Sequence, residues 1–117
     1  MIGPVAVRYA LQVGEVDPYA LADDILLPLA TTASFGGGRR PDRGTALTVT
    51  GAEVSAVQRR AGLLEVRVFN PRPAPTTVEI PEHTGWLVDL RGRPVAPIEG
   101  RFDLGPHRIA TVRLDPD

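Results

Sequence analysis

The chain has 117 residues, 13 basic and 14 acidic side chains, a formal net charge of −1 and no cysteine. This length is typical of one domain, and it allows a hydrophobic core that needs no disulfide or metal. So balanced a charge creates no field that would attract nucleic acid or an anionic membrane surface. A fold without cysteine does not depend on redox conditions, which fits a cytoplasmic location. We therefore expect a single domain over 1–117 that binds neither nucleic acid nor membrane.

The first predicted element is a strand over residues 5–13. Apolar side chains occupy every second position there, which is the period of a strand with one buried face. Asp17 and Pro18 then predict a helix start, because aspartate caps helices and proline suits the first helical position. Pro28 predicts that this helix, the only one expected, ends near Leu26.

A loop over residues 34–44 follows the helix. It contains three consecutive glycines, a proline and several charged residues, a composition typical of a flexible connection. Arg39 and Arg40 in this loop could reach a binding partner, or they could be solvated as loop residues normally are. We keep both as candidate substrate-binding residues.

The rest of the chain predicts short strands separated by glycine and proline. Their apolar stripes are Leu47 and Val49; Val54 and Ala56; Leu64, Val66 and Val68; Val78 and Ile80; Trp86, Val88 and Leu90; Phe102 and Leu104; and Ala110, Val112 and Leu114. Strands that recur about every ten residues, with turn residues between them, are typical of antiparallel sandwiches. We expect an all-β, antiparallel β-sandwich of Greek-key, Ig-like shape, with about seven to eight strands and one short helix near the N-terminus.

Apolar residues also occupy the opposite side of several predicted strands. These residues are Val57, Phe69, Leu87 and Ile109. The outer face of an isolated sandwich is normally polar. We therefore expect one outer face to be covered by another protein surface, or by a second copy in a two-fold dimer when the chain is isolated.

Three motifs in the second half of the chain have a distinctive order. Residues 63–71, LLEVRVFNP, predict a strand that ends in Asn-Pro; residues 85–95, GWLVDLRGRPV, contain a turn; residues 106–114, PHRIATVRL, form the last strand. In this order and spacing they resemble the C-terminal β-domain of glycoside hydrolase family 38, the retaining α-mannosidases. Residues 7–11, followed by a helix and by residues 27–29, resemble the strand and helix that precede these motifs, so the resemblance covers nearly the whole chain.

The resemblance implies that the chain is the C-terminal fragment of a larger enzyme. In that family an N-terminal α/β domain holds a zinc ion and an aspartate nucleophile, and hydrolysis passes through a covalent glycosyl-enzyme. Nothing in this chain matches the catalytic segment, so no catalytic residue is carried over. We expect the chain to be inactive alone, to need no cofactor of its own, and to brace the catalytic and neighbouring β-domains.

The candidates for a site within the chain are few. Its two histidines, His83 and His107, are expected in a turn and at a strand start, and zinc normally needs three or four suitable ligands. We therefore expect no metal site. Trp86 is the residue best suited to stack against a sugar ring, because an aromatic face complements the apolar face of a pyranose. Its period with Val88 and Leu90 instead favours packing in the core.

Two alternatives to the accessory-domain hypothesis stay open. A free-standing carbohydrate-binding β-sandwich would use Trp86 as its platform. A protein–protein interaction module would have the same Ig-like shape and no sugar chemistry. Shielding of Trp86 in the core would argue against the first alternative, because a buried indole cannot stack on a ligand.

Overall fold

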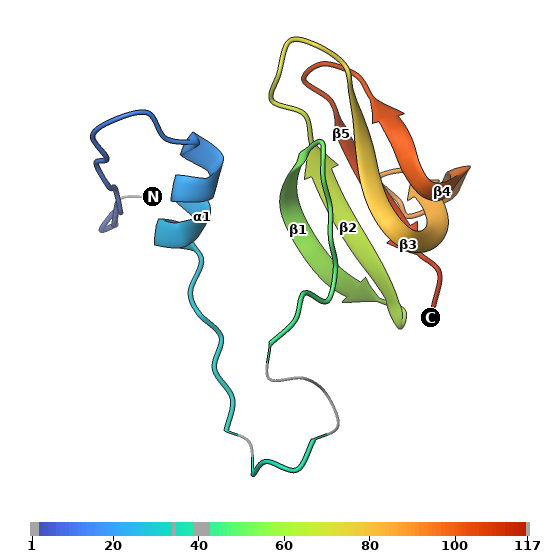
Figure 1. The fold of residues 1–117 in the computed structure, drawn as a ribbon. Coiled ribbons are helices and arrows are strands. Elements are labelled where there is room, and N and C mark those ends of the chain that lie inside the picture. Colours follow the sequence, from blue (N-terminus) through green and yellow to red (C-terminus); the bar gives the residue numbers. More distant parts are fainter. Residues whose placement is uncertain (1–2, 34, 39–42, 117) are drawn as a thin grey trace. The chain divides into compact units, whose positions relative to one another are not determined.

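The computed structural model describes residues 3–33, 35–38 and 43–116. The chain divides into two compact units, Met1–Arg40 and Pro41–Asp117. The elements are α1 (Pro18–Leu26) in the first unit and, in the second, β1 (Glu53–Arg60), β2 (Leu63–Phe69), β3 (Thr76–Val88), β4 (Pro94–Leu104) and β5 (Ile109–Leu114) (Figure 1). The described part of the chain is thus mostly β with one short helix, as the sequence predicts.

Helix α1 begins and ends where its local signals predict. Oδ1 of Asp17 accepts hydrogen bonds from the backbone N–H groups of Tyr19 (2.9 Å) and Ala20 (3.5 Å), which caps the helix. The last helical residue is Leu26, two positions before Pro28. A residue that precedes proline avoids helical geometry, which explains the end of the helix.

Residues 5–13 do not form the predicted strand. The alternating side chains of this segment are 77–90 % exposed; they are Val5, Val7, Tyr9, Leu11 and Val13. A strand exists only when a neighbouring strand satisfies its backbone N–H and C=O groups, and no strand pairing of this segment occurs among the described residues. Residues 8–12 and the apolar side of α1 together line an open hollow of about 410 Å³. The first unit by itself therefore leaves much of its own apolar surface uncovered.

The second unit contains one antiparallel sheet with the strand order β1-β2-β5-β3-β4. The described residues form five strands, fewer than the seven to eight expected. One reason is that the stripe of Val78 and the stripe of Trp86 belong to a single long strand, β3. Another is that residues 47–49 lie outside the sheet, next to a single bridge between Thr50 and Glu79.

Strand β3 bends at residues 80–83, where its pairing with β4 is interrupted. Before the bend, Val78 and Ile80 are fully buried in the core. After it, Gly85 and Leu87 take the core side, opposite apolar residues of β5. The alternation therefore shifts by one residue, as expected when a strand contains extra residues that its partner does not match.

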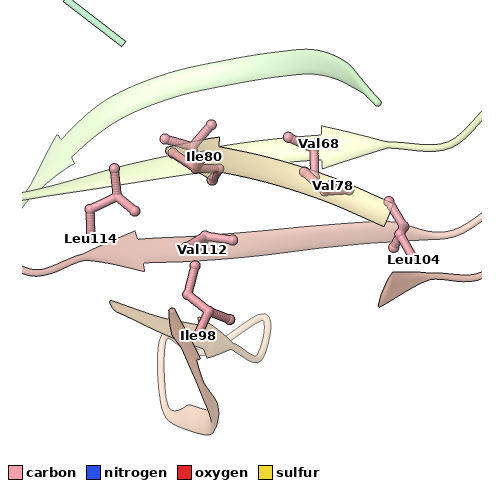
Figure 2. Packing of buried hydrophobic residues seen from close by; sticks show 8 residues of the cluster. Val68, Val78, Ile80, Ile98, Leu104, Val112 and Leu114 are labelled. Atoms are coloured by element: carbon pink, nitrogen blue, oxygen red, sulfur yellow. The ribbon is translucent and has the colours of Figure 1, made fainter. Parts of the chain in front are cut away.

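The core lies between the two parts of this bent sheet. Its residues are at most 5 % exposed and are Val66, Val68, Val78, Ile80, Ile98, Leu104, Val112 and Leu114. Figure 2 shows Val78 and Ile80 among the side chains from β2 and β5. The first half of β3 pairs with β4 but not with β5. The bend therefore folds the β3–β4 hairpin over the face of β2 and β5 and closes the core.

Asn70 ties the loops at one end of the sheet together. Its side chain is 1 % exposed, and Nδ2 donates to the carbonyl oxygens of Ala74 (2.8 Å), Gly105 (3.1 Å) and Leu104 (3.5 Å). Oδ1 accepts a hydrogen bond from the backbone N–H of Arg72 at 3.0 Å. Each polar atom of the amide is thus satisfied, as a buried polar group requires. This confirms that Asn70 ends its strand and has a structural role.

Candidate functional site

Trp86 lies on the outer face of the sheet, away from the core. It is 42 % exposed and stands directly across from Arg113 of β5 and Pro97 of β4. The prediction that Trp86 packs in the core is therefore wrong. Trp86 and Val88 do share one side of β3, but the bend in this strand turns that side outward. Leu90 lies outside the strand, in an exposed turn. Solvent can reach the indole, as a platform for a ligand requires.

A row of polar side chains continues from Trp86 across the sheet. Strand pairing places Arg113, Glu65 and Gln58 next to one another on β5, β2 and β1. Arg113 donates from Nε (3.1 Å) and Nη2 (2.7 Å) to Oε1 of Glu65. Gln58 donates from Nε2 to Oε2 of Glu65 at 3.3 Å. Glu65 is only 3 % exposed, although it points away from the core.

The charge of Glu65 is stabilised by its neighbours. The hydrogen bonds from Arg113 hold the pKa of the Glu65 carboxyl below its ordinary value of 4.5, against the opposing effect of burial. The hydrogen bond from Gln58 and the positive charge of Arg60 lower the same pKa further. Glu65 is therefore an anion at neutral pH, and its role is to hold Arg113.

A second guanidinium group lies close to the first. A Cβ atom at Gly92 would stand 2.8 Å from Nη2 of Arg113 and 3.5 Å from Nη1 of Arg60. Both groups therefore contact the same point of the turn between β3 and β4. Gly92 has a φ of +80°, and both this angle and the lack of space favour glycine. Beside Trp86 the outer face thus has two positive side chains, Arg113 and Arg60, and one carboxylate, that of Glu65.

Asp89 holds that turn in place. Its Oδ1 accepts hydrogen bonds from the backbone N–H groups of Arg91 and Arg93, both at 2.9 Å. Its Oδ2 accepts from Nε of Arg93 at 2.7 Å. Hydrogen bonds from Arg93 lower the pKa of Asp89 below its ordinary value. These hydrogen bonds fix the turn between β3 and β4, which contacts the guanidinium group of Arg113 at Gly92.

The four apolar residues expected on an outer face divide between the two faces. Phe69 and Ile109 are cross-strand partners on the outer face, and Ile109 is 69 % exposed. Leu87 instead packs against the core, because the bend in β3 changes its side. Val57 is exposed but stands opposite Val66, a core residue, because β1 has a bulge after Val54. The outer apolar patch is therefore smaller than predicted.

The remaining candidates contribute little to this site. His83 is half-buried in the bend of β3, and His107 is exposed in the turn before β5. Across the described ranges, no three histidine, aspartate or glutamate side chains gather closely enough to hold a metal ion. Arg39 and Arg40 lie outside the residues that the structure describes. Nor does any helix in the described part have the length and apolarity to cross a membrane.

The sequence contains a signal for the side of the strand on which Glu65 lies, but no signal that identifies this residue as part of a site. The alternation from Leu64 to Val68 provides that side assignment, and a similar alternation applies to Arg113. The missing information was the pairing of β2 with β5, which joins residues 48 positions apart.

No family model, no curated protein and no solved structure matches this chain.

Proposed function

We propose that the chain is the non-catalytic C-terminal accessory β-domain of an α-mannosidase-like glycoside hydrolase and braces its catalytic domain. One observation carries the proposal: the apolar side chains of residues 5–13 alternate as in a strand, yet are 77–90 % exposed. Burial of one such side chain is worth about 1.5–3 kcal/mol, so a protein gains by covering a whole row of them. In the parent enzyme a neighbouring domain provides that cover.

The finer features of the fold belong to the same proposal. The strand predicted over residues 5–13 forms when a strand of the parent enzyme pairs with it, and the Greek-key, Ig-like sandwich of seven to eight strands is reached only in that enzyme. Zinc and the aspartate nucleophile lie in the catalytic domain, and the enzyme is cytoplasmic. The order of the motifs at 63–71, 85–95 and 106–114 supports this assignment.

Activity measurements test the proposal directly. The chain alone and the product of the complete reading frame are purified and assayed with an aryl α-mannoside and zinc. We expect no turnover by the chain alone and chelator-sensitive turnover by the complete protein. In the complete protein, Tyr9→Asp with Leu11→Asp should lower the melting temperature, whereas Arg8→Asp, also in this segment, should change it less. A reading frame that encodes no further domain would refute the proposal.

A second candidate function is carbohydrate binding through Trp86. The exposure of this indole on the outer face of the sheet favours it, because an exposed aromatic ring can stack on a pyranose. The chain has one tryptophan, so its fluorescence reports on this site alone. Saturable changes in emission on addition of oligosaccharide, abolished by denaturation, would support binding. A spectrum unaffected by neutral and acidic sugars at millimolar concentration would exclude it.

A further inference from the structure

We infer that the outer-face cluster of Trp86, Arg113 and Arg60 binds an acidic saccharide, with a pyranose on the indole and a carboxylate on the guanidinium groups. The inference rests on the carbohydrate-binding candidate function and specifies its ligand class. It depends on three properties of the cluster: the exposed ring, the fixed orientation of Arg113 and the excess of positive charge.

The indole of Trp86 remains exposed because the side chain of Arg113 points away from it, toward Glu65. Arg113 is the cross-strand partner of Trp86, and Cβ atoms of such pairs are about 4.5–5.5 Å apart. A guanidinium group at this distance could lie over the indole and cover it. Instead it binds Glu65, which is on the strand beyond β5, and Trp86 keeps 42 % of its surface exposed. The indole and the guanidinium are thus neighbours that both remain available to one ligand.

The fixed orientation of Arg113 reduces the entropic cost of binding. Two hydrogen bonds from Nε and Nη2 to Glu65 hold the planar guanidinium group of Arg113, and the turn at Gly92 contacts Nη2 of the same group. An arginine that is already ordered loses less freedom when a ligand binds. The side chain of Arg113 is nevertheless 23 % exposed, so an anion can approach it.

The excess of positive charge comes from Arg60. Both oxygens of Glu65 already accept hydrogen bonds, from Arg113 and Gln58. The ion pairs in the described part of the chain leave Arg60 without a carboxylate of its own. A carboxylate is the natural complement to two guanidinium groups, since arginine binds such anions through charge-assisted hydrogen bonds. An uncharged sugar would contact the ring but leave this charge unmatched.

The test uses the fluorescence of Trp86 with three probes of similar size. These are the trimer of galacturonic acid, its fully methyl-esterified form, which is uncharged, and triglutamate, which is charged but has no sugar ring. We expect the acidic trimer to bind about ten-fold or more tightly than its ester. This preference should weaken strongly at 1 M salt, where charges are screened within about 3 Å. Triglutamate should bind more weakly than the acidic trimer.

Variants separate the contributions of the ring and the charge. Arg60→Gln should lower the preference for the acidic trimer and leave the affinity for the ester unchanged, because it keeps the Glu65–Arg113 pair. Arg101→Gln, a change at an exposed arginine of β4, is the matched control and should have no effect. Trp86→Ala should abolish binding of both sugars, which calorimetry can measure without the indole.

Each contrary outcome has a distinct meaning. Equal affinity for the acidic trimer and its ester would overturn the inference but keep carbohydrate binding. No binding of either sugar would overturn both. Equal binding of triglutamate would show an acidic-peptide site instead of a saccharide site. An unchanged preference in Arg60→Gln, or a reduction in Arg101→Gln of the same size as in Arg60→Gln, would refute the assignment of the charge to this cluster.

Discussion

Arg113 donates two hydrogen bonds to one carboxylate oxygen of Glu65, across the β2–β5 pair and on the face of the sheet away from the core. Gln58 donates to the other oxygen. The carboxylate is thereby almost fully covered at a position where a strand normally exposes a charged side chain to solvent. This pair joins β2 to β5, the middle strand of the sheet, and orders the surface beside Trp86.

Glu65→Gln should lower the free energy of unfolding at pH 7 by about 1–3 kcal/mol, because Arg113 loses a charged partner. The pKa of Glu65 is depressed, so its contribution is complete above the unfolded value of 4.5 and is lost as pH falls through the lower folded value. Urea denaturation at pH 7 and pH 3 measures both effects. The variant should lose less stability on acidification than the natural protein; an equal loss would contradict this account.

The matched control for Glu65 is Asp89→Asn. The pKa of Asp89 is also lowered, mainly by hydrogen bonds from Arg93, but the side chain lies in an exposed turn. Solvent screens such interactions, so we expect a smaller effect on stability than that of Glu65→Gln.

Asn70→Asp should destabilise the protein more than Asn70→Ala. The alanine variant leaves the carbonyls around Nδ2 unpaired, which costs about 1–3 kcal/mol. The aspartate variant places a carboxylate against those same carbonyls, which adds repulsion and raises its pKa. Thermal melts at pH 7 and pH 4 provide the comparison. The stability of the aspartate variant relative to alanine should improve at pH 4; no such improvement would contradict the assigned amide orientation.

Gly85→Ala should disrupt the contact between β3 and β5. A Cβ atom at Gly85 would lie 2.2 Å from the carbonyl oxygen of Arg113, a backbone atom that cannot move without breaking the strand pair. Overpacking of this kind typically costs about 1–3 kcal/mol. Gly44→Ala is the control, because nothing lies within 4 Å of the added atom. Equal midpoints in urea for both variants would show that β3 and β5 are not packed as described.

Trp86→Ala should cost much less stability than Ile80→Ala, despite its larger side chain. Ile80 is fully buried, and truncation of such a residue typically costs about 2–5 kcal/mol. Trp86 keeps 42 % of its surface in solvent, so less burial is lost. Acrylamide should also quench the emission of Trp86 efficiently. A greater loss of stability in Trp86→Ala, with an indole shielded from acrylamide, would place this residue in the core.

Ile109→Glu should reduce self-association of the isolated chain. Phe69 and Ile109 form an apolar pair on the outer face, where two copies of the chain can meet about a two-fold axis. Light scattering over a range of concentrations measures the effect. Arg101→Glu, at an exposed site on β4, should leave any self-association unchanged. A monomer at every concentration in the natural protein would remove the basis for this prediction.

Features that depend on neighbours in the chain were predictable from the sequence. Asp17 and Pro28 predicted both ends of α1, because capping and the restriction before proline act over a few residues. The alternation within β2 separated core residues from Glu65, because strand geometry alone sets that period. The turn within residues 85–95 was predictable too, because Asp89 and the groups that it binds lie within four residues of each other.

Only the tertiary structure decided which side of each strand is covered and which strands pair. A period of two shows which side chains share a face, but the same pattern occurs whether that face meets the core or solvent. The bend at residues 80–83 therefore moved Trp86 outward and Leu87 inward without a clear signal in the sequence. Residues 5–13 have the pattern of a strand and remain unpaired, because pairing depends on a partner that lies elsewhere. Glu65 meets Arg113 for the same reason: contacts between distant residues depend on the order of strands in the sheet.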